Sequence, residues 1–406
     1  MNKKGGQPVS LRRESLLPQA EMLEVETRKQ RMVIGIPLEN AERESRVPIT
    51  PEAVEILTLH GHRIVIESGA GDAANYPDHQ YAESGAWIAE SRKEAYQSDV
   101  VVKITPPDLE EIGMMKERLM LISTFQTRIH KEKAYIEGLM KKRITAISMD
   151  RIRDVNQCYP LIRSMSGIAG NTAVLIAGEY LSNVRGGKGV MLGGITGITP
   201  TEVVILGAGT AAEFAVRAAL GMGAFVKVFD ESVHRLRRLQ TAVGINIPTS
   251  IFHPRVIEKA LKSADVVIGA VRSDDNGPSF FITEEMVMGM KKGSVIVDIS
   301  IDHGGCVATS ECRTQNDPVF TKHGVIHYCV PNIPSRVART ASIATSNVLL
   351  PMLKSMGRLG GISHHLKEDE GFRHGVYIYN GLLTNETIGK RFGIPFKDID
   401  LLMAAF

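Results

Sequence analysis

Short hydrophobic runs alternate with helical segments over the first part of the chain. Runs at 32–37, 62–67, 100–104, 120–123 and 145–149 predict buried strands. Thr50-Pro51-Glu52 has the residues of a helix start, because threonine suits the N-cap, proline the first turn and glutamate the helix dipole. Gly61 would end that helix, and residues 131–141 predict another. This alternation indicates a parallel α/β architecture.

A second α/β run begins after a predicted helix at 167–183 and a glycine-rich stretch at 186–197. Its strand-like segments lie at 203–206, 225–230, 266–269, 294–299 and 325–329. Crossover connections between these segments predict one doubly wound domain. From about Ala338 the pattern turns helical, most clearly at 343–356 and 385–392.

Length and composition limit the class of protein. A chain of 406 residues is too long for one ordinary core and favours two domains. Hydrophobic residues make up 43% and charged residues 23%, which is typical of a soluble globular protein. The net charge of +3 gives no reason to expect a nucleic acid or an anionic membrane as a partner. No run of about 20 apolar residues occurs, so no membrane span is expected.

The N-terminus and the cysteines point to an ordinary cytoplasmic protein. Residues 1–31 are largely polar and lack the apolar core of a signal peptide, so we expect a flexible or loosely docked extension there. The four cysteines form no CxxC pair and no zinc-like cluster; they are Cys158, Cys306, Cys312 and Cys329. Reduced thiols and no metal site are the expectation.

The segment 203–230 carries the clearest chemical motif. Its first strand leads into Gly207-Ala208-Gly209-Thr210-Ala211-Ala212, which opens an apolar helix. Gly207 permits a tight turn, Gly209 lets backbone N–H groups approach a pyrophosphate, and Ala212 keeps the helix close to the strand. The helix N-terminus would face the phosphate with its unsatisfied donors. Such a turn predicts a dinucleotide site, with a merely structural glycine turn as the alternative.

Asp230 ends the next strand, about 20 residues after the turn. An acid in this place binds a ribose 2′-hydroxyl and repels a 2′-phosphate, which favours NAD over NADP. Arg235, Arg237 and Arg238 leave a second interpretation open, because an arginine near this acid can accept a 2′-phosphate. A solvated helix face is the interpretation that we prefer for these arginines.

Several segments outside the turn carry a resemblance to a known family. They lie at 35–37, 44–47, 67–71, 165–170 and 189–194. The most specific, Val297-Asp-Ile-Ser-Ile-Asp-His-Gly-Gly-Cys306, is followed by a further segment at 325–332. From residue 32 to residue 392 the chain resembles the alanine dehydrogenase family. It is also similar to the NAD-binding subunit of proton-translocating transhydrogenase, but the set as a whole looks more like alanine dehydrogenase.

The resemblance implies an activity and a domain arrangement. The activity is reversible, NAD-dependent oxidative deamination of L-alanine to pyruvate and ammonia. The implied fold is α/β with two doubly wound domains, in which a Rossmann NAD-binding domain at 161–338 is inserted in a discontinuous substrate domain made of 32–160 and 339–406. A homo-oligomer, commonly a hexamer, is also implied.

The resemblance assigns roles to individual residues. Arg46 matches the family's substrate arginine, whose planar guanidinium can hold a carboxylate bidentately; a surface ion pair with Glu42 or Glu44 is the alternative. Asp302 matches the catalytic aspartate, which could accept protons from the ammonium group or the attacking water; a turn acid is the alternative. The positions implied to contact NAD are Ser166, Gly207, Gly209, Thr210, Ala211, Asp230, Arg235, Val271, Arg272, Ile299, Ile301, Asp302, Val330, Asn332 and Ile333.

Two positions depart from the family's pattern. The family has two lysines in the strand near 100–107, and here Lys103 keeps the first while Thr105 replaces the second, which contacts substrate. Gln126 stands where the family has a proton-transferring histidine, and glutamine cannot shuttle a proton near neutral pH. We still predict Arg46, Lys103 and Thr105 as substrate-binding residues and Asp302 and Gln126 as catalytic residues.

Two other residues offer compensation. His303 stands where the family usually has glutamine and could take over proton transfer, although a simple loop substitution is the interpretation that we prefer. Arg163 could replace the missing lysine's charge. Because losing a general acid or base typically forfeits about 10²–10⁴ in rate, three hypotheses stay open: an alanine-dehydrogenase-like enzyme, hydride transfer on another amino or keto acid, and a non-catalytic NAD(H)-binding sensor.

Overall fold

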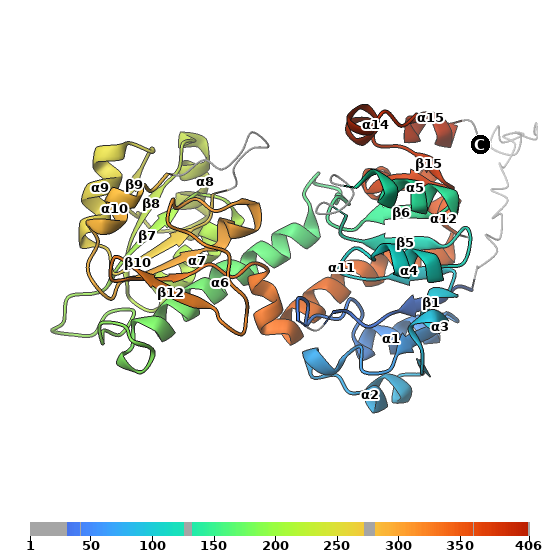
Figure 1. The fold of residues 1–406 in the computed structure, drawn as a ribbon, viewed down its shortest axis with the longest axis horizontal. Coiled ribbons are helices and arrows are strands. Elements are labelled where there is room, and N and C mark those ends of the chain that lie inside the picture. The colour runs from blue at the N-terminus through green and yellow to red at the C-terminus, as the bar shows by residue number, and fades with distance from the viewer. Residues whose placement is uncertain (1–30, 41, 126–131, 272–280, 360, 405–406) are drawn as a thin grey trace, which may run out of the picture.

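The protein folds around two sheets that lie side by side (Figure 1). The computed structural model describes residues 31–40, 42–125, 132–271, 281–359 and 361–404. Two long helices, α6 (Pro160–Leu181) and α11 (Ala338–Arg358), run between the parts of the molecule that hold the sheets. None of the helices in the described part is long and apolar enough to cross a membrane.

The first sheet has eight strands in the order β15-β14-β6-β5-β4-β1-β2-β3. Six strands are parallel: β1 (Val33–Ile36), β2 (Arg63–Glu67), β3 (Trp87–Ala89), β4 (Val100–Val102), β5 (Met120–Ser123) and β6 (Thr145–Ser148). Two antiparallel strands from the end of the chain complete it: β14 (Val376–Tyr379) and β15 (Leu382–Leu383). The sequence pattern predicts the strands within 32–149 except β3, but it predicts only helices after Ala338, so β14 and β15 are a correction. Their apolar runs are too short for periodicity to separate strand from helix.

The second sheet has seven strands in the order β12-β13-β11-β10-β7-β8-β9. The parallel strands are β7 (Glu202–Leu206), β8 (Phe225–Phe229), β9 (Thr249–Ser250), β10 (Val266–Gly269), β11 (Val295–Asp298) and β13 (Val325–Tyr328). β12 (Val319–Lys322) is antiparallel at one edge. The predicted α/β fold with two doubly wound sheets is confirmed, and the order reverses between β7 and β10, where such sheets bind ligands.

Helices cover both faces of the second sheet, because its central strands are apolar on both sides. Val203 and Ile205 of β7 pack in one core with α6 and α7 (Thr210–Gly221). Val204 and Leu206 of the same strand pack in another core with α9 (Pro254–Ser263) and α10 (Glu284–Met288). A strand buried on both faces reads as a continuous hydrophobic run, as the sequence has here.

The two helices predicted within 32–149 begin and end close to their predicted bounds. α1 (Pro51–Leu59) has Thr50 at its N-cap, but the threonine side chain makes no capping hydrogen bond; it lies 3.5 Å from the hydroxyl of Ser346 in α11 instead. α5 (Lys133–Lys141) matches the second predicted helix. The remaining helices are α2 (Asp78–Glu83), α3 (Arg92–Tyr96), α4 (Leu109–Met114), α8 (Val233–Val243), α12 (Ile362–Glu368), α13 (Glu370–Arg373), α14 (Glu386–Phe392) and α15 (Ile399–Ala404).

A close contact of α6 with α7 sets the position of the glycine turn. Gly170 of α6 lies so near the start of α7 that an added Cβ would be 2.1 Å from the carbonyl oxygen of Ala211. Any side chain at this position would push the two helices apart. Because α7 begins directly after Gly209, the packing of α6 fixes where the turn lies relative to the first sheet.

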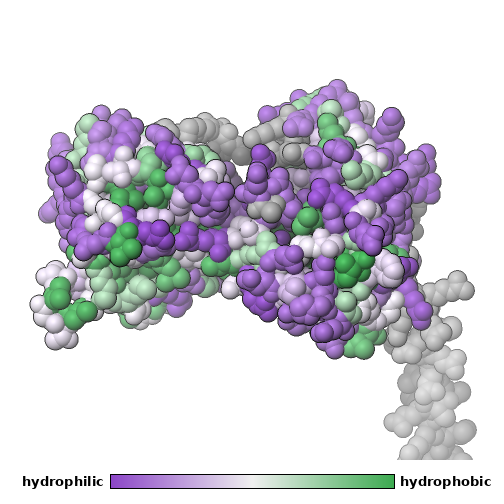
Figure 2. Space-filling model, turned by 60° about the horizontal axis from the view of Figure 1, so that its bottom comes forward, coloured by the Kyte–Doolittle hydropathy of each residue, from purple (hydrophilic) through white to green (hydrophobic). Residues whose placement is uncertain are grey.

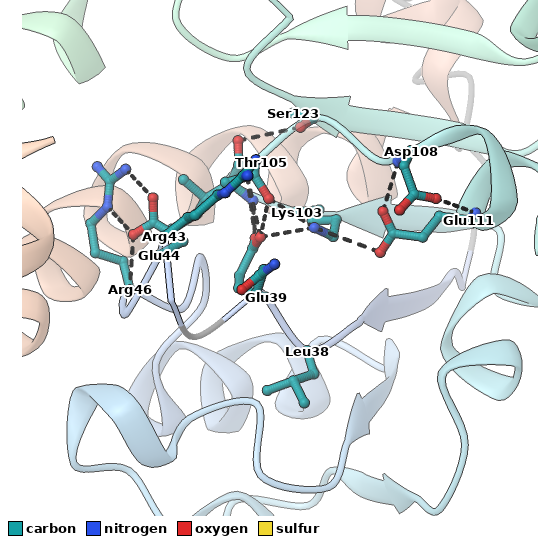
Figure 3. Close-up of polar contacts among 12 residues, drawn as sticks. Leu38, Glu39, Arg43, Glu44, Arg46, Lys103, Thr105, Asp108, Glu111 and Ser123 are labelled. Carbon is teal, nitrogen blue, oxygen red and sulfur yellow. Dashed lines mark hydrogen bonds and ion pairs between the residues drawn. The ribbon is translucent and has the colours of Figure 1, made fainter. Parts of the chain in front are cut away.

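A buried polar network joins the ends of β1 and β4 in the first sheet (Figure 3). Glu39 accepts hydrogen bonds from Lys103 Nζ at 2.9 Å, from the Ile104 N–H at 2.5 Å and from the hydroxyl of Thr105. Lys103 Nζ also donates to Thr105 Oγ1 at 2.8 Å and lies 3.7 Å from Glu111 Oε1. The side chains of Lys103 and Glu39 are each only 4% exposed. The network therefore fixes the position of Glu39, from which the chain continues toward Arg46.

The protonation of Glu39 depends on this network. Burial raises the pKa of Glu39 above its ordinary value, and the positive charge of Lys103 opposes that rise. A buried carboxylate without its cation is costly, because the interior does not replace the lost hydration. Lys103 is thus the residue that allows Glu39 to stay ionised.

Replacing Lys103 with methionine should lower the free energy of unfolding by about 3–5 kcal/mol, because Glu39 is then buried without its cation. The pKa of Glu39, already raised, should rise further in the folded protein. The folded state then holds a proton that the unfolded chain has released, so stability falls as the pH rises toward the raised pKa. Urea unfolding measures this effect: the decrease in the free energy of unfolding relative to the parent protein should be smaller at about pH 5 than at about pH 8.

Lys116→Met is the matched control. Lys116 pairs with Asp99 at 2.6 Å, but these side chains are 36% and 48% exposed, so the control should lose less than about 1 kcal/mol. A loss in Lys103→Met no larger than that of the control would contradict the role of the buried pair. A loss that does not change with pH would contradict the role of Glu39.

Candidate active site

A cleft of about 1200 Å³ opens where the parts of the chain that hold the two sheets meet. Arg46, Met165, Asp302 and Asn332 line it together with residues that follow β6 and residues near the end of the chain. These positions are distant in the sequence, and each follows a strand or lies in a helix beside the sheets. Open α/β sheets bind ligands at the carboxyl ends of their strands, so this is the expected place for a site.

Arg46 forms a two-bonded ion pair with Glu44 at one side of the cleft (Figure 3). Its Nε and Nη2 atoms each donate to a Glu44 oxygen at 2.6 Å. The remaining contact, from Nη1 to the sulfur of Met165 at 3.1 Å, is with a weak acceptor. Since a guanidinium has five N–H donors, donors on Nη1 and Nη2 are left for a ligand's oxygen atoms. The ion pair that the sequence offered as an alternative role therefore exists, but its side chains are 11% and 1% exposed, which is not a surface pair.

Asn332 connects this ion pair to Asp302. Its side-chain Nδ2 donates to Glu44 Oε2 at 2.9 Å, and its backbone N–H donates to Asp302 Oδ1 at 2.9 Å. The residue has a φ of 57°, in the left-handed region, which asparagine tolerates better than most residues. That backbone conformation lets one residue serve both acids.

Burial and local charges set the protonation of the two acids in opposite directions. Burial would raise the pKa of Glu44, but the Arg46 guanidinium holds it below its ordinary value. Asp302 opens to the cleft while protein surrounds most of it, and this burial raises its pKa against the opposing effects of the Asn332 N–H and the charges of His303 and Arg46. An acid whose pKa is raised toward neutrality suits general acid–base chemistry.

A buried aspartate shapes the loop that carries Asp302. Asp298 ends β11 and accepts from the N–H groups of Ser300 and Cys306, both at 3.0 Å, and from the hydroxyl of Ser310 at 2.7 Å. An added Cβ on Gly305, whose φ is +83°, would be 2.9 Å from this carboxylate. Much of the motif at 297–306 thus builds the loop, and Asp302 and His303 are the parts of it that line the cleft.

The glycine turn after β7 has the geometry that a dinucleotide requires. Gly207 has a φ of +101°, and an added Cβ would be 2.5 Å from the carbonyl oxygen of Ala270. An added Cβ on Gly209, by contrast, would meet no heavy atom within 4 Å. Gly209 therefore leaves open space where a phosphate can approach the N–H groups of Thr210 and Ala211 at the start of α7. The residues present fit a dinucleotide.

Asp230 lies directly beside this turn and is 3% exposed. Its carboxylate accepts from the N–H of Ala208 at 2.7 Å and from the N–H of Ser232 at 2.8 Å. Each oxygen keeps lone pairs for a ribose hydroxyl. Arg235 and Arg237 are exposed on α8, and Arg238 donates to the carbonyl of Ala208 at 3.0 Å. Arg238 therefore braces the turn as well as facing solvent.

The other predicted cofactor positions lie along the same edge of the second sheet. Ser166 is half-buried on α6, Val271 follows β10, and Ile299 and Ile301 belong to the short turn after β11. Val330 and Ile333 are each 2% exposed, and their side chains pack in the core. Only their backbone atoms are therefore available to contact a ligand. Arg272 and Gln126 lie outside the described residues.

Lys103 and Thr105 are placed away from the cleft lining. Both are bound in the buried network with Glu39, and neither lines the cleft. Arg163 is exposed on α6 and does not line it either. His303 does line the cleft, next to Asp302.

Sequence reasoning missed several cleft residues. Arg151 and Arg153 follow β6, and His374 precedes β14. The two arginines carry a signal that could have found them, since charged residues directly after a buried strand lie at the ligand-binding edge of the sheet. His374 carries no such signal, because β14 was not predicted.

Comparisons with known proteins agree along nearly the whole chain. Residues 35–169 match the family model described as alanine dehydrogenase/PNT, N-terminal domain, and residues 173–386 match the corresponding C-terminal domain. An alanine dehydrogenase of Staphylococcus saprophyticus is 34% identical over 91% of this chain and 99% of its own. An alanine dehydrogenase of Methanococcus maripaludis is 36% identical over 90% of this chain and 98% of its own.

Solved structures give the same result. An L-alanine dehydrogenase superposes with a TM-score of 0.82 at 34% identity, over 89% of this chain and 99% of its own. A transhydrogenase from Sinorhizobium meliloti shares the fold, with a TM-score of 0.74 at 21% identity over 87% of this chain and 99% of its own. The resemblance predicted from the sequence is confirmed, and the chain belongs to the alanine dehydrogenase/PNT family.

Proposed function

We propose that this protein is an NAD-dependent amino-acid dehydrogenase that reversibly converts L-alanine to pyruvate and ammonia. The observation that carries the proposal is the meeting of Arg46 and Asp302 in one cleft, linked through Asn332. Arg46 offers a fixed cation for the substrate carboxylate, and Asp302 offers a base on the opposite side of that link. The names of the relatives at 34% and 36% identity support alanine as the substrate.

The residues of the cleft suit the steps of such a reaction. NAD, when bound at the glycine turn, supplies the acceptor for the hydride that leaves the substrate Cα. Arg46 would hold the carboxylate and orient the Cα–H bond. Asp302 would take a proton from the ammonium group and release it to solvent, and it would then take a proton from the water that adds to the resulting iminium carbon. Asp302 would return that proton to the amino group, so that ammonia leaves as the C–N bond breaks. The hydroxyl of the water adduct then loses its proton to solvent, and the keto acid remains.

A second candidate is the same reaction on another amino or keto acid. It is favoured by the placement of Lys103 and Thr105, because the cleft lining among the described residues contains no lysine. Lys103 is committed to Glu39, and the hydroxyl of Thr105 is bound to the same carboxylate. The substrate lysine of the family thus has no counterpart in the cleft, and Arg46 would hold the carboxylate without it.

Mixing the purified protein with NAD and a panel of L-amino acids, while following NADH absorbance, should show turnover on L-alanine. Asp302→Asn should lower kcat by about 10²–10⁴, because it removes the base. The rate of the parent protein should fall as the pH drops through the pKa of Asp302, which lies above the ordinary value of about 3.9.

Glu386→Gln is the control for that variant. Glu386 also lines the cleft but pairs with Lys390 at the surface, so kcat should stay close to that of the parent protein. Turnover on another amino acid but not on L-alanine would contradict the first candidate and support the second. Tight NADH binding without turnover on any amino acid would contradict both and leave a sensor.

We propose NAD as the cofactor in preference to NADP, because Asp230 stands beside the glycine turn. Asp230→Asn should narrow the preference for NAD by about tenfold or more, since a hydrogen bond from the ribose to a charged acceptor is lost and the repulsion of a 2′-phosphate is relieved. The measurement is the ratio of kcat/KM for the two cofactors. Glu231→Gln, at the exposed neighbouring acid, should leave the ratio unchanged. Equal ratios in both variants would contradict this assignment.

We also propose that the protein is a homo-oligomer, a hexamer if it follows the family. Large apolar side chains are exposed on the segment 184–198, where Val184 is 92% and Ile198 67% exposed. Figure 2 shows such hydrophobic side chains on the lobe at the lower left. Exposed apolar patches of this kind mark interaction sites.

Light scattering should give a mass of several chains for the parent protein. The double change Val184→Glu with Ile198→Glu should reduce that mass, because it places charges in the proposed interface. Leu59→Glu, at an 80% exposed position on α1, is the control and should keep the parent mass. A monomeric parent protein would overturn the proposal.

A further inference from the structure

One wall of the cleft, formed by Arg151, Arg153 and His374, carries several basic side chains close together. Arg151 and Arg153 follow the carboxyl end of β6 and line the cleft, and His374 lines it beside them. Arg46 and Asp302 line the same cleft. A ligand held at the reaction centre can therefore extend toward this wall.

Arg151 and Arg153 differ from Arg46 and Arg373 in having no acidic partner; Arg391 also lines the cleft without an ion pair among the described residues, but it is exposed. Arg46 pairs with Glu44, and Arg373 pairs with Asp400 at 2.7 Å. Within the described residues, neither Arg151 nor Arg153 has a carboxylate within 4.0 Å. Their positive charge is left for a ligand.

The guanidinium groups also contact only neutral acceptors, and for Arg151 that acceptor is the hydroxyl of Tyr377. Arg151 Nε is buried and has no partner among the described residues. Arg153 donates only to neutral groups, the hydroxyl of Tyr159 at 3.0 Å and Gln157 Oε1 at 3.2 Å. A buried N–H without an acceptor costs free energy, and an oxyanion would satisfy it with a charge-assisted bond.

The backbone of this wall is held in place before any ligand binds. The Arg153 N–H donates to the Gly371 carbonyl at 3.0 Å, and the Ser148 N–H donates to the Gly375 carbonyl at 2.7 Å. His374 Nδ1 donates to the carbonyl of Arg151 at 3.0 Å, which leaves Nε2 for a ligand. An added Cβ on Gly371 would be 2.2 Å from the Arg153 carbonyl oxygen, so the segments pack as closely as backbone allows. Such rigidity reduces the entropic cost of binding.

We propose that Arg151, Arg153 and His374 form a second anion subsite, which takes an anionic group at the end of the substrate's side chain. The inference rests on the second candidate of the proposed function, the same reaction on another amino acid, and names that substrate as an amino acid with a carboxylate or phosphate on the side chain. The methyl group of alanine offers these cations nothing to bind. The cleft, at about 1200 Å³, exceeds the roughly 300–1,000 Å³ typical of sites for drug-sized ligands, so a longer substrate fits.

The dinucleotide is not the anion that this wall serves. The glycine turn and Asp230 do not line the cleft, and the phosphates of a dinucleotide bind at that turn. The wall belongs to the first sheet, whereas the turn belongs to the second. The nicotinamide has to enter the cleft to accept the hydride, but it carries no anionic group. A substrate anchored at Arg46 is therefore the ligand that can bring an anion to Arg151 and Arg153.

The test compares kcat/KM for anionic amino acids with kcat/KM for their neutral counterparts. NAD is the cofactor in each assay, and the absorbance of NADH reports turnover. L-glutamate is paired with L-glutamine, L-2-aminoadipate with L-norleucine, and O-phospho-L-serine with L-serine, so that the carboxylate and phosphate arms are separate. In at least one pair, kcat/KM for the anionic amino acid should be higher than kcat/KM for its neutral partner. That ratio should fall by roughly 10- to 100-fold in Arg151→Met and in Arg153→Met, because a hydrogen bond to a charged group is lost.

Arg63→Met is the matched control, because Arg63 is an exposed arginine at the start of β2 and should leave the ratio unchanged. Turnover on alanine with no preference for any anionic side chain would overturn the subsite and leave the proposed function standing. A ratio that is unchanged in both cleft variants would also overturn it.

Titration calorimetry with glutarate and butyrate keeps the subsite testable if no amino acid is turned over, an outcome that contradicts the proposed function by itself. Glutarate should bind the parent protein more tightly than butyrate, because it has a second carboxylate. Arg153→Lys should retain part of that difference, and Arg153→Met should lose it. Equal binding of the two acids by the parent protein would overturn the subsite.

Discussion

The ion pair between Arg46 and Glu44 is the interaction on which the candidate site depends. The buried charge of Glu44 would be costly without a counterion, and Arg46 supplies one. Glu44 in turn orients the guanidinium of Arg46. Through Asn332 the same glutamate is connected to Asp302 in the other half of the molecule. Arg46 and Asp302 are therefore placed relative to each other by Glu44 and by the side chain and backbone N–H of Asn332, rather than by the sheets alone.

The loops that hold this pair are supported from both sheets. The network of Glu39 and Lys103 fixes the position from which the chain continues toward Arg46, and Asp298 fixes the loop before Asp302. Each support is a buried acid whose pKa burial raises. The acids are satisfied by different means: a lysine serves Glu39, and N–H and hydroxyl donors serve Asp298. Rigid surroundings of this kind hold reacting groups in place without reorganisation during the reaction.

The position of Thr105 shows how a departure from the family's pattern can be absorbed. A lysine in its place would add a second cation beside Glu39, whereas threonine binds that glutamate with a neutral hydroxyl. The cleft then relies on arginine for its positive charge, at Arg46 and, in our inference, at Arg151 and Arg153. Arginine differs from lysine in offering a planar fork of donors that matches a carboxylate. This set of cations favours the second candidate of our proposed function, in which the substrate is an amino acid other than alanine.

The sequence by itself determined the parallel strands of both sheets except β3 and β9, together with the glycine turn, the place of Asp230 and the family. These depend on local patterns, namely buried apolar runs and glycines where the backbone needs them. Only the tertiary structure decided that β14 pairs with β6 and that His374 therefore lies against Arg151. It also decided that Lys103 turns to Glu39 and that Asn332 joins Glu44 to Asp302. The reason is physical: these bonds form between segments far apart in the chain, and their partners are chosen by how the two sheets pack and by which buried charges need a counterpart.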